Sequence, residues 1–335
     1  MFGPVAREVL AFGTVSFVVF GLGSGLLSSQ QALSTLSNQR MCSMYLVIIT
    51  GTVAFLISLP RTLDRLAWMG VLSAAVIAVA GFIAMIGAGV NPVPGRSLTV
   101  AASSNFFDAF LAVTNPVFAY AGHFMFFILI SEMRKPEDAM KAAWCLQDFA
   151  PVFYVVFSGV MYVYIGNTVQ SPVLFSLPPV WAKAAFAIAL PNFLLSVMPC
   201  SAKLVFVRYF VIQSTSIRIP YSGGRFGLCC VLQAQRSAMA AILAIAVPIF
   251  SYLIGITAAL FAAWYTYGLA GCFWLHDAYH LEGGLDGLKR RPIGTTLAVL
   301  TIISGTFICV AGTYVSIKLI AEAYANGQVG RPFVC

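Results

Sequence analysis

The sequence predicts an all-α polytopic membrane protein of about nine transmembrane helices, and two features of its composition support this. The chain is 60% hydrophobic and only 9% charged, whereas soluble domains carry about 25% charged residues. Its mean hydropathy is +0.91. No segment is polar enough to form a separate soluble unit, so we expect residues 1–335 to form a single transmembrane domain.

Eight apolar stretches define the expected helices in chain order, because a crossing takes about 20 residues. The seventh stretch, 239–275, is too long for one crossing. We expect it to form two crossings, joined by a tight turn near Ser251–Gly255, after Pro248. Glu8 beside the first run, and the length of that run, favour an uncleaved helix over a signal peptide. The stretches lie at 9–27, 41–59, 67–90, 106–131, 149–166, 180–202, 239–275 and 294–317.

The distribution of Lys and Arg orients these crossings. If nine crossings alternate, 14 of the 19 basic residues lie on the side of the N-terminus and five on the other. The positive-inside rule then predicts a cytoplasmic N-terminus and an extracellular or lumenal C-terminus. A single crossing at 239–275 would give 13 and six, so segment length is the stronger argument for two.

The net charge of +8 is expected mainly in cytoplasmic loops, the longest basic one running from Arg208 to Arg236. Orientation and attraction to anionic membrane lipid explain this charge, so no nucleic-acid partner is expected. Residues 91–105 and 167–179 are predicted outer loops. Residues 132–148 are a predicted cytoplasmic loop with a short interfacial helix starting at Lys135–Asp138.

The stretch at 106–131 combines an apolar run with features that break a helix. Pro116 cannot donate a backbone N–H, Asn115 before it is disfavoured in helical dihedrals, and Gly122 adds a flexible point. His123 and Asp108 are ionisable groups within the same stretch. Lipid cannot satisfy freed backbone groups, so such breaks occur only against protein, a cavity or a ligand. Transporters bind substrates at such breaks.

Other motifs give no enzyme or metal chemistry. The eight cysteines are scattered without a CxxC pair. His276 and His280 are spaced to share one helix face, but they lack an HExxH pattern, and a simple loop is favoured over a metal site. No Ser-His-Asp set, carboxylate pair or Walker loop occurs. We therefore expect no catalytic residue, no metal and no cofactor.

The first apolar stretch contains GLGSG at residues 21–25. No strand precedes it, so a nucleotide-binding loop is excluded. Small residues allow close helix packing in membranes, which is the favoured interpretation. Ser24 could also face a cavity.

Several blocks of the chain resemble the amino acid/auxin permease family, in particular fungal neutral amino acid permeases. FAYAGH at 118–123, followed by FF, ISEM, a basic residue, Pro and acids, resembles the sixth helix of the family and the loop after it. GPVAREVLAFGTVSFVVFGLGSG resembles the third helix, SLPRTLDRLAWMGVLS the loop between the fourth and fifth, and DFAPVFYVVFSGVMYVYIGNTVQSP the seventh helix.

This resemblance implies a LeuT-type bundle of the APC superfamily, usually of eleven helices in two inverted repeats. The broken helix would hold the ammonium and carboxylate ends of an amino acid. Gly21 and Ser24 would lie on a helix that lines the site. Counting crossings, the chain would correspond to family helices three to eleven and lack the first two. The break residues are Phe118, Ala119, Tyr120, Ala121, Gly122 and His123.

We therefore predict a secondary active amino acid transporter that works by alternating access around this break. Neutral substrates are favoured because no buried charge is available to pair a charged one. Family resemblance favours proton coupling, with sodium left open. The plasma membrane and the vacuolar membrane remain alternatives, and the sequence does not indicate an oligomeric state. The other hypotheses are a truncated, non-transporting homologue that acts as a membrane partner or sensor, and a seven-helix receptor, which the nine crossings disfavour.

Overall fold

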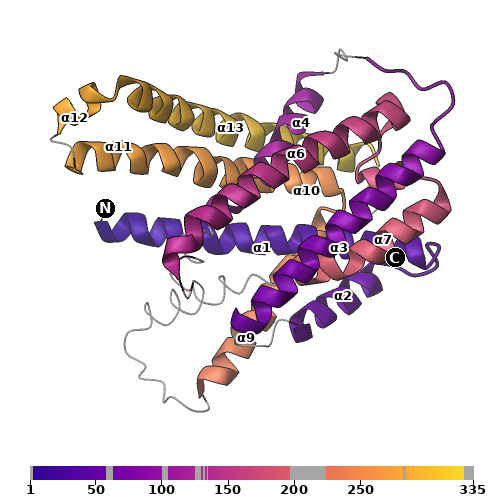
Figure 1. The fold of residues 1–335 in the computed structure, drawn as a ribbon. Helices are drawn as coiled ribbons and strands as arrows, with labels where there is room; N and C mark the ends of the chain where they lie inside the picture. Colours follow the sequence, from indigo (N-terminus) through magenta and orange to yellow (C-terminus); the bar gives the residue numbers. More distant parts are fainter. Residues whose placement is uncertain are drawn as a thin grey trace.

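Long helices make up most of the computed structural model, which describes residues 3–57, 63–99, 105–124, 130, 133, 135–196, 224–281 and 284–327 (Figure 1). The α-helices are α1 (Gly3–Leu36), α2 (Ser43–Ile57), α3 (Leu63–Val90), α4 (Phe106–Ala119), α6 (Ala139–Ile165), α7 (Pro179–Ser196), α9 (Gly224–Ala246), α10 (Phe250–Thr257), α11 (Leu269–Leu281), α12 (Leu285–Arg290) and α13 (Pro292–Ala325). Short 3₁₀ turns are η1 (Ala121–Phe124), η2 (Pro136–Asp138), η3 (Gly166–Thr168) and η4 (Val173–Ser176), and two π-helical turns are η5 (Ala258–Ala262) and η6 (Trp264–Gly268).

The helices have the length and surface of a polytopic membrane protein. Five helical segments of the described chain are long and apolar enough to cross a bilayer, and four shorter apolar helices accompany them. Large apolar side chains such as Trp68, Val155 and Phe307 are well exposed. Exposed apolar surface on this scale is what a helix presents to lipid. The predicted all-α membrane class is therefore confirmed.

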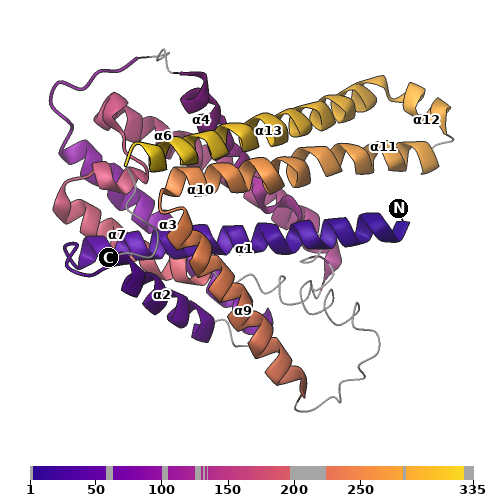
Figure 2. The ribbon, with the colours of Figure 1, turned by 180° about the vertical axis from the view of Figure 1, so that it is seen from behind.

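Helix α1 is the centre of the bundle and packs against α2, α7, α9 and α10 (Figures 1 and 2). Its residues Val18, Leu22 and Leu26 are buried in one cluster with Ala240 of α9 and Leu253 of α10.

The glycine run of α1 contributes to this packing. A Cβ atom on Gly23 would lie 3.3 Å from the backbone oxygen of Ala240, so a glycine here brings α1 and α9 into close contact. The close packing expected from the glycines at 21–25 is confirmed at this position.

The serines of α1 satisfy their hydroxyl groups within the helix. Ser24 Oγ donates to the carbonyl oxygen of Gly21 (2.7 Å), and Ser28 and Ser29 donate to Ser24 and Gly25 (both 2.9 Å). Such bonds to the preceding turn allow a hydroxyl to be buried away from water. The helix can therefore place small polar residues in the protein interior.

The long stretch at 239–275 does form parts of two helices, but the turn differs from the prediction. Helix α9 ends at Ala246, and α10 begins at Phe250, so the turn comprises Val247, Pro248 and Ile249 rather than 251–255. Proline cannot continue a helix from the preceding residue, which places the turn at Pro248 itself. From Phe250 to Leu281 the helix continues through both π turns.

Helix α13 lies side by side with α11 in both views (Figures 1 and 2). Small residues make this contact close. Cβ atoms on Gly271 and Gly305 would meet backbone atoms of the facing helix at 2.5 and 2.9 Å, and one on Gly312 would lie 2.8 Å from Ala259. Helix association in lipid depends on such van der Waals packing rather than on the hydrophobic effect.

Two predicted loops are partly helical. The helix start expected at Lys135–Asp138 is confirmed, because η2 begins at Pro136. The loop expected up to 148 is wrong from Ala139 onward, because α6 starts there directly after η2 and runs into the crossing. The basic loop expected from Arg208 to Arg236 is wrong from Gly224 onward, where α9 begins. Arg236 is only 3% exposed within α9. The rest of that loop, and the expected crossing residues 125–129 and 197–202, lie outside the described residues.

His276 and His280 lie in helix α11, not in the loop that was favoured for them. Their ring centroids are 4.2 Å apart, as expected for residues four apart on one helix face. In the described part of the chain, no group of three or more His, Cys, Asp or Glu side chains is arranged to hold a metal ion.

Candidate functional site

The predicted helix break is present at the end of α4. The helix passes through Pro116 and continues to Ala119, and the backbone then changes at Tyr120 (φ −97°, ψ 9°) to the 3₁₀ turn η1. The Tyr120 N–H still donates to the oxygen of Pro116 (3.1 Å). The last carbonyl groups of an α-helix lack intrahelical partners, and no basic residue lies in the last turn of α4. As a helix C-terminus, this end of α4 carries negative partial charge.

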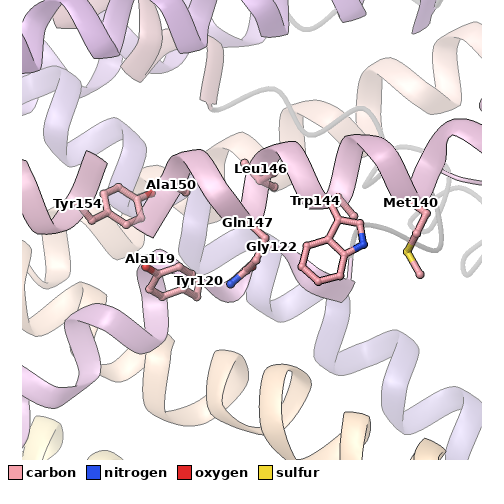
Figure 3. Close-up of a pocket in the computed structure, with 10 residues that line it drawn as sticks. Ala119, Tyr120, Gly122, Met140, Trp144, Leu146, Gln147, Ala150 and Tyr154 are labelled. Atoms are coloured by element: carbon pink, nitrogen blue, oxygen red, sulfur yellow. The ribbon is translucent and has the colours of Figure 1, made fainter. Parts of the chain in front are cut away.

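A groove of about 310 Å³ opens beside this break, between the end of α4 and helix α6. Figure 3 shows its α6 wall, formed by one face of the helix, opposite Ala119, Tyr120 and Gly122. Ala119 and Gly122 are exposed, so the backbone of the break is reachable from the groove. The lining residues are Ala119, Tyr120, Gly122, Met140, Ala143, Trp144, Leu146, Gln147, Ala150 and Tyr154.

The described lining of the groove is apolar and aromatic, and none of these described residues carries a charged side chain. The rings of Tyr120 and Tyr154 meet edge to face, with centroids 5.7 Å apart and an interplanar angle of 81°. The side-chain amide of Gln147, the two tyrosine hydroxyls and the indole N–H of Trp144 are its polar groups (Figure 3). An apolar cavity with a few polar groups is the usual form of a small-molecule site.

Phe118 and Ala121 are not among the described residues that line the groove. Ala121 is buried in a cluster with Val117 of α4, Phe17 of α1 and the alanines of the π-helical region, and Phe118 packs against the same cluster. His123 lies in η1, but its side chain is outside the described part of the structure. The break thus has one side closed by protein and one side open to the groove.

Gly21 and Ser24 are not among the groove-lining residues. A Cβ atom on Gly21 would meet nothing within 4 Å, whereas Ser24 is 6% exposed and bonded to its own helix. On α1 it is Phe17, one turn earlier, that reaches the break. The role of Gly21 and Ser24 in binding stays a prediction.

The α6 wall was missed by the sequence analysis. Trp144, Gln147 and Tyr154 lie on one helix face, together with Met140 and Ala150, at spacings of three and four residues. That periodicity was available in the sequence. Residues 132–148 were assigned to a loop with only a short interfacial helix, so this helix face was not followed into the crossing that starts at 149.

Comparisons with known proteins show which family and which proteins this chain is similar to. A family described as transmembrane amino acid transporter protein matches residues 1–318. The N amino acid transport system protein of Neurospora crassa is 27% identical over an alignment that covers all of this chain and 73% of that protein. Two proteins described as transmembrane transporters, from Gibberella moniliformis and Fusarium pseudograminearum, are 26% and 24% identical, each over all of this chain and 72% of their own length.

Proposed function

We propose a function from the premise that this chain belongs to the transmembrane amino acid transporter family, as the match over residues 1–318 shows. Its function is amino acid transport across a membrane, and it is an integral membrane protein with an amino acid as its small-molecule substrate. We propose further that the substrate binds at the break after α4 and extends into the groove that α6 lines.

The open side of the break is the observation that carries this proposal. Ala119 ends α4 and Gly122 lies in the 3₁₀ turn after it, and both residues are exposed. Hydrocarbon cannot satisfy backbone groups freed at such a break, so we infer that the groove holds water or a polar ligand there. The carbonyl end of α4 suits the ammonium group of an amino acid, because a helix C-terminus attracts positive charge.

The composition of the groove supports neutral substrates. None of the ten described residues that line it is charged, so a charged substrate side chain would lose its hydration without gaining an ion pair from them. Alternating access around the break would carry the amino acid across the membrane. We propose the proton as the coupling ion, on the basis of the family resemblance. Uptake that depends on a sodium gradient would instead identify sodium as the coupling ion.

The proposal is tested by filling the groove from Gly122. A Cβ atom there would meet nothing within 4 Å, and the backbone φ is ordinary, so Gly122→Leu adds volume to the groove without a clash in the fold. Gly159→Leu is the matched control, because Gly159 also lies in open surroundings but does not line the groove. We expect Gly122→Leu to lower uptake of uncharged L-amino acids at least tenfold at equal surface expression, and Gly159→Leu to keep it.

Two outcomes would contradict the proposal. Unchanged uptake in Gly122→Leu would mean that the substrate does not occupy the groove. Absence of uptake by the wild-type protein, expressed from its own gene and present at the membrane, would instead favour a non-transporting membrane partner or sensor.

A further inference from the structure

The α6 wall of the groove contains its own interruption of helical hydrogen bonding. Pro151 lies inside α6 and has no backbone N–H. In a regular α-helix this N–H would donate to the carbonyl group four residues earlier, which is that of Gln147. Proline therefore leaves the Gln147 carbonyl without its usual donor, and Gln147 is one of the residues that line the groove. Backbone carbonyl groups without helical partners thus occur in both walls, at the end of α4 and at Gln147.

The Gln147 side chain is also available to a ligand. It is exposed, and within the described chain no residue forms a hydrogen bond with its amide group. By contrast, the hydroxyl groups of Ser158 and Tyr162, further along α6, donate to backbone oxygens of the protein (both 2.7 Å). Gln147 therefore keeps its hydrogen-bonding capacity at the surface of the groove.

Figure 3 shows how the polar groups of the α6 wall are directed. The Gln147 side chain extends from α6 toward the break, between Tyr120 and the ring of Trp144. The indole nitrogen of Trp144 lies on the far side of that ring, toward Met140. Gln147, rather than Trp144, therefore directs a side-chain donor at the break.

The two charged ends of an amino acid need different partners. The ammonium group only donates hydrogen bonds, so the carbonyl groups at the end of α4 and at Gln147 suit it. The carboxylate only accepts them, and carbonyl groups cannot serve it. The side-chain amide of Gln147 supplies two N–H donors without a charge, and hydrogen bonds to an ionised acceptor are stronger than those between neutral groups.

We propose that Gln147 is a substrate-binding residue, whose side-chain amide donates a hydrogen bond to the α-carboxylate of the amino acid. The α-ammonium group then lies against the carbonyl groups at the end of α4 and at Gln147, and the substrate side chain extends along the apolar lining. This inference rests on the transport function and the groove site proposed above. It adds the orientation of the substrate and the residue of α6 that sets it.

The test compares L-leucine with L-leucinol, which keeps the ammonium group but has a hydroxymethyl group in place of the carboxylate. The inhibition constants of both are measured against uptake of radiolabelled L-leucine, and we expect wild type to bind L-leucine at least tenfold more tightly. In Gln147→Leu, the constant for L-leucine should rise at least fivefold, and that for L-leucinol should stay within twofold. Gln147→Glu brings a negative charge to the carboxylate, so it should weaken L-leucine further and leave L-leucinol unweakened.

Gln235→Leu is the control, because Gln235 is also exposed on a helix, in α9, but is not among the described residues that line the groove. Both of its inhibition constants should stay within twofold of wild type. Equal weakening of the two ligands in Gln147→Leu would mean that Gln147 shapes the groove without binding the carboxylate, and no weakening would mean that it does not contact the substrate. Either result overturns the proposal, as does a wild-type protein that binds both ligands equally well.

Thermal stabilisation of the detergent-purified protein by each ligand is the second measurement, in case uptake by Gln147→Leu is too low to measure. Stabilisation by L-leucine that is as large in both Gln147 variants as in wild type also overturns the proposal. Failure of the proposed function is seen separately, because the wild-type protein would then not take up L-leucine or other uncharged amino acids, or Gly122→Leu would leave uptake unchanged.

Discussion

The contact between α11 and α13 gives a quantitative prediction through Gly271. A Cβ atom on Gly271 would lie 2.5 Å from the backbone oxygen of Ala298, 2.7 Å from Ile302 Cγ1 and 2.7 Å from Thr301 Oγ1. Carbon and oxygen atoms in close, favourable contact are about 3.3–3.6 Å apart. The variant Gly271→Ala therefore requires the two helices to separate locally by roughly 0.8 Å, because the nearest atom belongs to the backbone and cannot rotate away.

Two opposing terms set the magnitude. Replacing glycine by alanine within a helix favours the helix by about 0.8–1 kcal/mol. Overpacking a close contact costs about 1–3 kcal/mol, and three simultaneous contacts, one of them with backbone, place Gly271 at the upper end. The expected result is a net loss of about 2 kcal/mol in the free energy of unfolding.

Two glycines without close neighbours serve as controls, because alanine at these positions is expected to be neutral or stabilising rather than destabilising. Gly51 in α2 and Gly159 in α6 have nothing within 4 Å of an added Cβ atom. Gly51→Ala and Gly159→Ala should therefore be neutral or stabilising by up to about 1 kcal/mol, from helix propensity alone. Between Gly271→Ala and these controls, the expected difference is about 3 kcal/mol.

The assay measures the temperature at which half of a fluorescently tagged, detergent-extracted protein leaves the monodisperse peak in size-exclusion chromatography. A change of 1 kcal/mol corresponds to about 2–4 °C for a domain of 150–250 residues. We expect Gly271→Ala to unfold several degrees below both controls. A midpoint for Gly271→Ala equal to or above those of the controls would refute the close packing of α11 on α13.

Two further predictions concern hydrogen bonds between helices. Tyr265→Phe should lose about 0.6–1.7 kcal/mol of stability, the range measured for such bonds in membranes, because the hydroxyl donates to the oxygen of Leu10 in α1 (2.6 Å); exposed Tyr314→Phe is the control, and equal melting midpoints for the two variants would contradict the bond. Asn192→Leu should lower the stability by a similar amount, because it removes the hydrogen bonds from Asn192 Nδ2 in α7 to Ser73 Oγ (2.8 Å) and Ser73 O (3.2 Å) in α3. The same chromatographic assay measures the effect, and an unchanged melting midpoint would argue against these bonds.

The sequence predicts the helices well because lipid allows few alternatives. A backbone in hydrocarbon must satisfy its hydrogen bonds internally, so a long apolar run is already strong support for a helix. The predicted helix boundaries are wrong where a helix extends beyond its apolar run. Helix α6 begins ten residues before the run that starts at 149, and α9 begins well before 239. Gln147 and Arg236 in these extensions are polar, and hydropathy alone assigns such residues to loops.

Only one wall of the candidate site could be predicted from local sequence. The break after α4 follows from the proline and glycine chemistry of Pro116 and Gly122, six positions apart, so the sequence located the irregular backbone that contains Tyr120 and Gly122. Gln147 and Tyr154 line the same groove from α6, but their location depends on how two helices pack. No local pattern indicates which face of α6 meets α4.

The π turns account for how the bundle tolerates the break. A π turn inserts one residue into the helical register, and Ala258, Ala262 and Ala263 present small side chains where Val117 and Ala121 approach. Large side chains at these positions would hold α4 away. One residue corresponds to about 100° of rotation around a helix axis, so without the residue that the π turn inserts, a different face of this helix would meet α4. The break is therefore closed on the π-helical side and open toward α6, which is the side from which we expect a ligand to enter.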